Sequence, residues 1–565
     1  MPSQRPSTTV SRLLRKRDEN RPFTESIRCW RRVVNLSIPR SNHRAARPVP
    51  RQTLRKANSP LLRWSTGVNV VQDQGVSEPI PHRAHGRQAP GQAGDSRAAS
   101  GPPRAGATVA ALALAALLAG AVWWTVTTDP SAEWVSPLGT LAAWALFLPA
   151  ALMARRIPAR HAAAVVLLGS VLLGIAAISA PPATSNDSAR YAWDGNVQKA
   201  GISPYQYVPA DEALRPLRPE WLFQDAGPDG TCHTNPFPSG TETTTNVPGG
   251  STLCTAINRP AVPTVYPAVA ELYFLAVRLI PGAEAGFGAF QLAGLLLSLA
   301  VTVLLLSYLR RTGRPAHQAV WWGWSPLVAF EAINGAHVDT LGAALALAAA
   351  LLLVGQRTLG SGMAFGAAVA TKLIPAISAP ALLYRRPVRF VAAAAATFAV
   401  AYVPYVLASG WTVLGYLPEY LRSEGYDGQD SPRFTLLKLV LPASWSAPVA
   451  LLLLLGLAVY VWRTTNAARP WDGQVFMVGG TLLLVSPSYP WYALLLLPFV
   501  VLSRRYEFAA IAPVLAMMYF TGAEPNGPLV ARLGLGAAAA LIAVATVVRH
   551  RAGRRIEGRG RGAEV

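Results

Sequence analysis

The hydrophobic pattern after residue 106 is that of a chain that crosses a membrane many times. Apolar runs close to the ~20 residues of a membrane-spanning helix alternate with short polar segments. About twelve spans are predicted, at 107–127, 134–153, 161–180, 284–308, 317–334, 338–355, 389–409, 448–463, 473–487, 491–503, 507–521 and 529–548. The sequence therefore predicts an all-α integral membrane protein built as a multi-span helical bundle.

Arginine clusters between the spans set the predicted orientation. They lie at 155–160, 310–314, 385–389, 504–505 and in the basic C-terminal segment 550–565. Because such loops stay in the cytoplasm, both termini are expected inside the plasma membrane. Residues 361–384 must then form a re-entrant hairpin, which prolines favour by breaking helical hydrogen bonds.

Two loops are expected outside, 181–283 and 410–447. Segment 265–281 of the first should form an amphipathic helix on the outer surface. Cys232 and Cys254 lie in the same loop, and because the outside is oxidising, a disulfide is favoured over two free thiols.

Composition separates a tail from the membrane domain at 107–549. Only 14% of the 565 residues are charged and 52% are hydrophobic, whereas soluble domains carry about 25% charged residues. Residues 1–106 carry +14 of the net charge of +22. Most of the positive charge therefore belongs to this tail and does not predict that the membrane domain binds nucleic acid. This stretch lacks apolar periodicity and is predicted to be disordered. It is read as a solvated cytoplasmic tail, an upstream stretch from a misassigned start, or a segment that binds anionic lipid.

Ionisable residues at the outer ends of spans are candidates for function, because charge is costly at membrane depth. Asp187, Arg190, Tyr191 and Asp194 recur at spacings of three and four, so one short helix would direct them at one site. A carboxylate beside an arginine suits a base that deprotonates a hydroxyl while the cation holds an anion. The structural alternative is that Asp187 caps that helix. No cofactor motif is present, although Asp187 and Asp194 are spaced to share a divalent ion.

A second group of polar residues lies at the junction of two spans and in the predicted hairpin. Glu331, Asn334 and His337 are spaced by three, and Asp339 follows. A helix continuing through the junction would align them, whereas a buried and mutually satisfied cluster is the alternative. Lys372 either extends its amine toward the membrane surface or pairs with a lipid phosphate.

Aromatic and amide side chains gather in the turns of the outer segments. A sugar ring stacks its CH face on an aromatic ring and hydrogen-bonds through its hydroxyls. An aromatic belt at the level of the lipid headgroups is the alternative. The side chains concerned are Trp193, Tyr205, Tyr207, Asn258, Tyr266, Trp491 and Tyr492.

Several of these strings together resemble the GT-C polytopic glycosyltransferases. The closest resemblance is to bacterial family 87, related to the polyprenol-phosphate-mannose-dependent mannosyltransferases. The strings are Asp187-x-x-Arg190-Tyr191-x-Trp193-Asp194-Gly195, Ile257-Asn258-x-Pro260, Asn334-Gly-Ala-His337-Val-Asp339, Lys372-Leu-Ile-Pro375 and Tyr489-Pro-Trp491-Tyr492. The chain departs from the family pattern at Tyr489, where the related turn has His, and at 222–256, which resembles an insertion.

The resemblance implies a membrane enzyme that transfers a hexose, with mannose the first candidate. The donor would be a polyprenyl-phosphate sugar, the acceptor an envelope glycan or lipid on the outer face, and the outcome inversion. Asp187 would be the general base, and Arg190, His337 and Lys372 would hold the donor phosphate. Sugars would contact Tyr191, Trp193, Asp194, Tyr205, Tyr207, Asn258, Tyr266, Glu331, Asn334, Asp339, Trp491 and Tyr492. A transporter or flippase of lipid-linked glycans is the alternative, but no internal repeat supports it.

Overall fold

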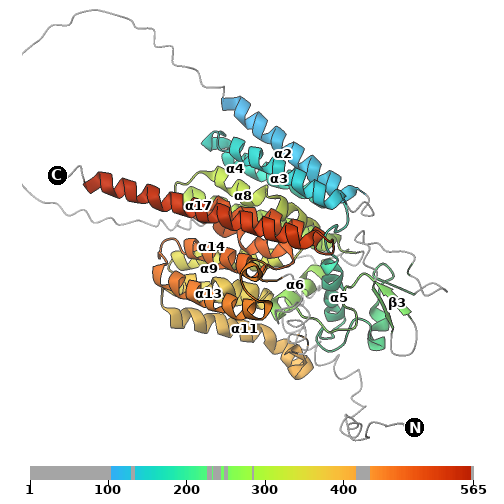
Figure 1. The fold of residues 1–565 in the computed structure, drawn as a ribbon. Helices are drawn as coiled ribbons and strands as arrows, with labels where there is room; N and C mark the ends of the chain where they lie inside the picture. The colour runs from blue at the N-terminus through green and yellow to red at the C-terminus, as the bar shows by residue number, and fades with distance from the viewer. Residues whose placement is uncertain are drawn as a thin grey trace, which may run out of the picture. The chain divides into compact units, whose positions relative to one another are not determined.

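A computed structural model describes most of the chain beyond the predicted tail (Figure 1). The described residues are 104–128, 134–225, 232, 243–246, 252–280, 282, 286–414, 416 and 433–561. The tail 1–106, for which disorder was predicted, therefore lies almost wholly outside the described residues. The middle of the second outer loop lies outside them too. Helix dominates what is described, in agreement with an all-α membrane protein.

Seven of the described helices are long and apolar enough to cross a membrane. They are α2 (Arg104–Thr127), α3 (Val135–Ala154), α4 (Ala159–Ala177), α7 (Gly288–Arg311), α11 (Pro387–Ser409), α13 (Ala443–Thr464) and α17 (Gly527–Arg561). An eighth span results if η4 (Val328–Asn334) and α9 (Asp339–Val354), which meet at a bend of 108°, count as one. The C-terminal basic segment is not separate from these helices, because α17 continues through it to Arg561.

The other predicted spans are helical but short or broken. They correspond to η3 (Ala316–Ala319) with α8 (Val320–Gly323) and η4, to α9, to α14 (Trp471–Val485), to η8 (Pro490–Leu495) with α15 (Leu497–Ser503), and to η9 (Tyr506–Ala510) with α16 (Ile511–Thr521). Prolines account for two of the breaks, after α8 before Pro326 and after α14 before Pro487, because proline lacks an N–H and restricts the preceding residue. The number of crossings thus stays a prediction.

The predicted hairpin consists of two helices joined at a lysine. Helix α10 (Thr358–Thr371) is followed by η5 (Ile374–Leu382), and between them Lys372 is extended, with φ −156° and ψ 144°. The break lies three residues before Pro375, which stands in the first turn of η5. Whether the segment re-enters the membrane stays a prediction.

The first outer loop is folded rather than open. It contains α5 (Asp187–Lys199), η1 (Glu212–Leu217), α6 (Ala268–Arg278) and a small antiparallel sheet that the sequence analysis did not predict. Strands β1 (Phe223–Asp225), β3 (Thr252–Thr255) and β2 (Thr243–Asn246) lie in that order, with Gln224 opposite Cys254. A disulfide joins Cys232 to Cys254. Figure 1 shows α5, α6 and β3 together at one end of the long helices.

Helix α6 forms where the amphipathic helix was predicted, but its charges do not face water. Glu271 and Arg278 are 0% and 1% exposed. The Nε of Arg278 donates to the carbonyl oxygen of Ala192 in α5 at 3.2 Å. The two helices of the outer loop are therefore held together by buried polar groups as well as by apolar packing.

Buried tryptophans join the long helices behind α5. The Nε1 of Trp324 donates to the carbonyl oxygen of Val166 in α4, at 3.0 Å, and that of Trp322 donates to Ser298 in α7, at 3.0 Å. Gly169 allows the approach, because a Cβ there would collide with the Trp324 ring. Since α5 begins nine residues after Ile178, the C-cap of α4, this packing fixes its starting point. The remaining short turns are η6 (Gly410–Leu414) and η7 (Leu437–Leu439).

Candidate active site

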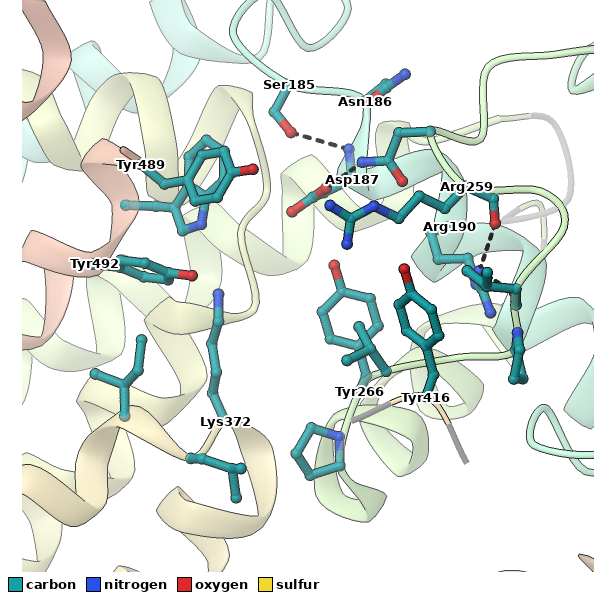
Figure 2. Close-up of a pocket in the computed structure, with 18 of the residues that line it drawn as sticks. Ser185, Asn186, Asp187, Arg190, Arg259, Tyr266, Lys372, Tyr416, Tyr489 and Tyr492 are labelled. Carbon is teal, nitrogen blue, oxygen red and sulfur yellow. Dashed lines mark hydrogen bonds between the residues drawn. The ribbon is translucent and has the colours of Figure 1, made fainter. Parts of the chain in front are cut away.

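A cavity of about 370 Å³ lies where α5 meets the ends of the apolar helices. Its wall combines the start of α5, the loop before α6, the break after α10, the turn before η8 and the end of α16. Seven of the residues selected from the sequence line it: Asp187, Arg190, Asn258, Tyr266, Lys372, Trp491 and Tyr492. Figure 2 shows Asp187 and Lys372 directed into the same space from opposite sides.

Asp187 occupies the first turn of α5, where a carboxylate is favourable to the helix dipole. Asn186, rather than Asp187, takes the N-cap position, and its side chain donates to the carbonyl oxygen of Ala256 at 2.6 Å. The carboxylate of Asp187 is 14% exposed. Asn258 Nδ2 donates to its Oδ1 at 3.1 Å, so the acid is oriented from the neighbouring loop and still reaches the cavity.

His337 lies directly behind Asp187. Its Nδ1 is 3.6 Å from Asp187 Oδ2, and its Nε2 is 3.3 Å from Glu331 Oε2. The ring stacks on Trp491 with centroids 3.9 Å apart, and Trp491 stacks in turn on Tyr489 at 4.7 Å. Because His337 is 1% exposed and does not line the cavity, it is placed to orient Asp187 rather than to contact a ligand.

The balance of these interactions lowers the pKa of Asp187. Burial alone would raise it, but the adjacent His337 ring and its charge, the charge of Lys372 and the amide of Asn258 together outweigh burial. The group therefore stays a carboxylate at neutral pH.

Arg190 is held on one side and left open on the other. Its Nε lies 2.9 Å from both carboxylate oxygens of Asp194, and its Nη1 donates to the carbonyl oxygen of Val262 at 3.2 Å. Its Nη2 is buried and has no hydrogen-bond partner among the described residues. A buried N–H without an acceptor is costly, so this atom marks a position for an acceptor supplied by a ligand.

A second buried carboxyl supports the anchor of Arg190. Thr264 Oγ1 donates to Glu271 Oε1 at 2.7 Å, and Gln198 Nε2 donates to Glu271 Oε2 at 2.8 Å. Burial raises the pKa of Glu271 well above its ordinary value, and the adjacent charge of Asp194 raises it further. Glu271 is therefore the protonated member of the pair, and Asp194 is the counter-ion of Arg190.

Lys372 enters the cavity from the break between α10 and η5. Its Nζ lies 2.6 Å from Asp339 Oδ2 and 4.8 Å from the centre of the Tyr492 ring. The extended backbone at Lys372 directs the amine away from both helices. One cation thus faces Asp187 across the cavity (Figure 2).

Comparison with known proteins identifies the kind of enzyme. Residues 264–487 match the sequence model of glycosyltransferase family 87. The protein is a glycosyltransferase. The match confirms the resemblance drawn from the sequence and favours an enzyme over the transporter alternative. None of the curated proteins or solved structures compared with the chain matches it.

The match to the family model and the long apolar helices together indicate that this glycosyltransferase is a multi-pass membrane protein. The matched range contains His337, Asp339 and Lys372, whereas Asp187 and Arg190 precede it. The structure brings these separate parts of the chain to one cavity.

Several residues expected to touch sugars lie in the packed interior of the glycosyltransferase. Tyr191 is 0% exposed and stacks on Phe274 with centroids 4.4 Å apart. Trp193 packs on Phe223, and the Tyr205 hydroxyl donates to the carbonyl oxygen of Tyr266 at 2.6 Å. Tyr207 lies against the same apolar cluster as Trp193. These four side chains shape the outer loop and do not line the cavity.

Asn334 was also expected to contact a sugar, but it does not line the cavity. Its Nδ2 donates to the carbonyl oxygens of Ala177 and Pro181, both at 3.0 Å, and its Oδ1 accepts from the backbone N–H of Ala183 at 2.8 Å. The expected continuous helix does not form, because Ala336 has a φ of +54°. Asn334 therefore fixes the segment that leads to α5, while His337 faces Asp187 with one ring nitrogen and Glu331 with the other.

Part of the cavity wall was not predicted from the sequence. Arg259 follows Asn258 directly, and Figure 2 shows its guanidinium directed toward Asp187. Tyr489, known from the sequence only as a departure from the family turn, lines the cavity with Tyr416 and Tyr519. Arg259 could have been selected from the sequence because it is adjacent to Asn258. Tyr519 lies inside an apolar range, and nothing in the sequence marks it as a site residue.

The described residues offer no obvious metal site. Among them, no three His, Cys, Asp or Glu side chains are grouped to hold an ion. Asp187 faces Asn258 and His337, while Asp194 faces Arg190, so the two aspartates do not share a ligand position.

Proposed function

We propose that this glycosyltransferase moves a hexose, with mannose the first candidate, from a polyprenyl-phosphate donor to a glycan or lipid acceptor on the outer face of the plasma membrane. The observation that carries the proposal is the pairing, in one cavity, of an ionised carboxylate with two cations, one beside it on α5 and one across the cavity. Asp187 supplies the carboxylate, and Lys372 and Arg190 supply positive charge.

Transfer by direct displacement uses both charges. The acceptor oxygen attacks the anomeric carbon, the bond from that carbon to the phosphate oxygen breaks, and the sugar is inverted. The hydroxyl proton passes to Asp187, and the polyprenyl phosphate leaves with the bonding electrons. Positioned cations stabilise the charge that develops on the leaving oxygen.

The open Nη2 of Arg190 supports a phosphate in the cavity. It is a buried donor without an acceptor among the described residues, and guanidinium groups pair well with phosphate oxygens. Lys372 is partly exposed, at 17% of its side chain, so a phosphate can share it with Asp339. Arg259 is a third cation in the lining of the cavity.

The size and lining of the cavity suit a sugar phosphate. Protein sites for small ligands measure about 300–1,000 Å³, and at about 370 Å³ this one accommodates a sugar and its phosphate while the prenyl chain stays in the membrane. Tyr266, Trp491 and Tyr492 offer aromatic faces for a sugar ring, and Asn258 offers an amide. Asp194, Glu331 and Asp339 would act by holding Arg190, His337 and Lys372 in place.

The proposed orientation rests on the arginine clusters. Arg155, Arg310 and Arg504 lie at the ends of spans or in loops remote from α5 in the sequence, and such loops face the cytoplasm. The cavity adjoins α5 and α6, at the ends of spans that lack these clusters.

The test is Asp187→Asn in membranes supplied with polyprenyl-phosphate mannose. Asn keeps the shape of the side chain but cannot accept the proton, so transfer should fall about 10²–10⁴-fold. Asp472→Asn is the matched control, because Asp472 lies at the start of α14 and outside the cavity. Near wild-type transfer by Asp187→Asn would overturn the base assignment, and use of a nucleotide sugar in place of the lipid donor would overturn the donor assignment.

A further inference from the structure

A second cavity, of about 560 Å³, lies in a groove between α3, α16 and α17. Trp321 and Tyr506 line it, with their rings stacked 4.6 Å apart. Leu148, Leu152 and Leu541 also line it and are 52%, 55% and 49% exposed. In a multi-pass membrane protein these side chains adjoin lipid, so the groove is open to a hydrocarbon chain.

The groove is separated from the proposed active site by most of α16. Pro513, near the start of α16, lines the groove, whereas Tyr519, near its end, lines the catalytic cavity. Six residues of α-helix rise about 9 Å. A lipid with its phosphate at the groove would therefore not present that phosphate to Asp187.

Positive charge gathers where the groove meets the α3–α4 loop. Arg155 lines the groove, is exposed and has no ion-pair or side-chain hydrogen-bond partner among the described residues. Glu507 lines it too, but its oxygens lie 2.8 Å from Arg549 and 3.6 Å from Arg505. These three arginines and one glutamate give a local net charge of +2.

Further arginines extend this positive region. The charges of Arg155, Arg314 and Arg504 all act on the hydroxyl of Tyr506. An apolar groove that ends in unneutralised arginines is complementary to a phospholipid with a negatively charged headgroup.

We propose that this groove binds one anionic phospholipid from the surrounding membrane. An acyl chain lies over Trp321 and Tyr506, between the leucines of α3 and α17, and the phosphate pairs with Arg155. The proposal does not rest on the sugar-transfer chemistry, because the groove shares no lining residue with the catalytic cavity.

Native mass spectrometry of the full chain in detergent, with added phosphatidylglycerol or phosphatidylcholine, tests the charge requirement. Wild type should retain phosphatidylglycerol in preference to phosphatidylcholine. Arg155→Gln should weaken phosphatidylglycerol binding about fivefold, the effect of one arginine near an anionic lipid. Arg156→Gln is the matched control, since Arg156 is the adjacent exposed arginine and does not line the groove. Equal binding by the two variants, or no preference in wild type, overturns the proposal.

A second pair of variants tests the groove itself. Ala145 lines it and is exposed, so Ala145→Trp should fill it and remove bound phosphatidylglycerol. Ala116→Trp, on the exposed side of α2, should retain the lipid. Polyprenyl phosphate provides the competing occupant. If it displaces phosphatidylglycerol from wild type and its own binding is lost in Ala145→Trp, the groove is a donor site and the phospholipid proposal is wrong.

Discussion

Helix α5 carries two aspartates seven residues apart that are stabilised in different ways. Asp187 faces the cavity and is bounded by His337, Asn258 and Lys372, which together lower its pKa. Asp194 faces the interior beside Arg190 and Glu271, and there burial dominates and raises its pKa. The same side chain on the same helix is thus ionised and accessible at one end, and buried as part of an anchoring cluster at the other.

Only one of these two carboxylates can act as a proton acceptor. A proton acceptor must be ionised and reachable by substrate, and Asp187 meets both conditions. Asp194 and Glu271 are held by Arg190, Thr264 and Gln198, and neither lines the cavity. Asp194 and Glu271, the inner cluster, therefore position Arg190. Asp187 with His337, Asn258 and Lys372, the outer cluster, carries out the reaction. The following variants test this division.

Arg190→Ala should have the largest combined effect on transfer and stability, because Arg190 lines the cavity and also pairs with buried Asp194. It removes a proposed phosphate donor from the cavity, which should cost about 10²–10³-fold in transfer. It also leaves Asp194 buried without its counter-ion, which should cost about 3–5 kcal/mol of stability. Transfer assays in membranes and thermal unfolding in detergent measure the two losses.

Arg215→Ala is the control for Arg190→Ala, because the side chain of Arg215 is 73% exposed in the same loop. If both variants unfold at the same temperature, Arg190 is not the anchor of the cluster.

Asp194→Asn should lower stability with less effect on the chemistry than Asp187→Asn. Breaking the buried pair with Arg190 should cost up to about 3 kcal/mol, since Asn retains one hydrogen bond to the guanidinium. Asp187→Asn should melt close to wild type, because Asp187 is partly exposed and Asn258 can still hydrogen-bond to the new amide. Melting temperatures of the two variants in one detergent provide the comparison, and the reverse order would contradict the division between the clusters.

Much of the outer cluster could be predicted from sequence because its residues occur in short polar strings between apolar runs. The spacing of Asp187, Arg190 and Asp194 predicted a helix, and α5 is that helix. The polar junction before α9 and the lysine after α10 were selected because charge is costly near lipid. Residues far apart in the chain were thus assigned to one site before their contacts were known.

What could not be predicted depends on backbone turns and on packing. The positive φ of Ala336 separates His337 from Glu331 and Asn334, which share η4, and periodicity carries no sign of such a turn. Aromatic residues in the outer loop are equally consistent with a sugar site and with an apolar core, and only burial shows that Tyr191 and Trp193 belong to the core.

His337→Gln should shift the pH dependence of transfer. Without the His337 ring and its charge beside the carboxylate, burial would raise the pKa of Asp187. On lowering the pH, the carboxylate would then become protonated earlier than in wild type. The acid limb of the rate profile should therefore move to higher pH, and raising the pH should restore activity. His317→Gln is the control, because His317 lies in η3 and outside the cavity. An unchanged acid limb would show that His337 does not set the ionisation of Asp187.

Glu271→Gln should have the smallest effect, because the inner cluster already holds Glu271 in its protonated form. Gln is neutral and can accept from Thr264, but its amide nitrogen cannot accept from Gln198, so the change at low pH should be about 1 kcal/mol. A raised pKa means that the folded state binds the proton more tightly than the unfolded state. Wild-type stability should therefore fall as pH rises above the ordinary pKa of a glutamate, and Glu271→Gln should lack that component of the fall. Melting temperatures of both proteins between about pH 5 and pH 8 measure it, and parallel curves would mean that Glu271 is ionised in the folded protein.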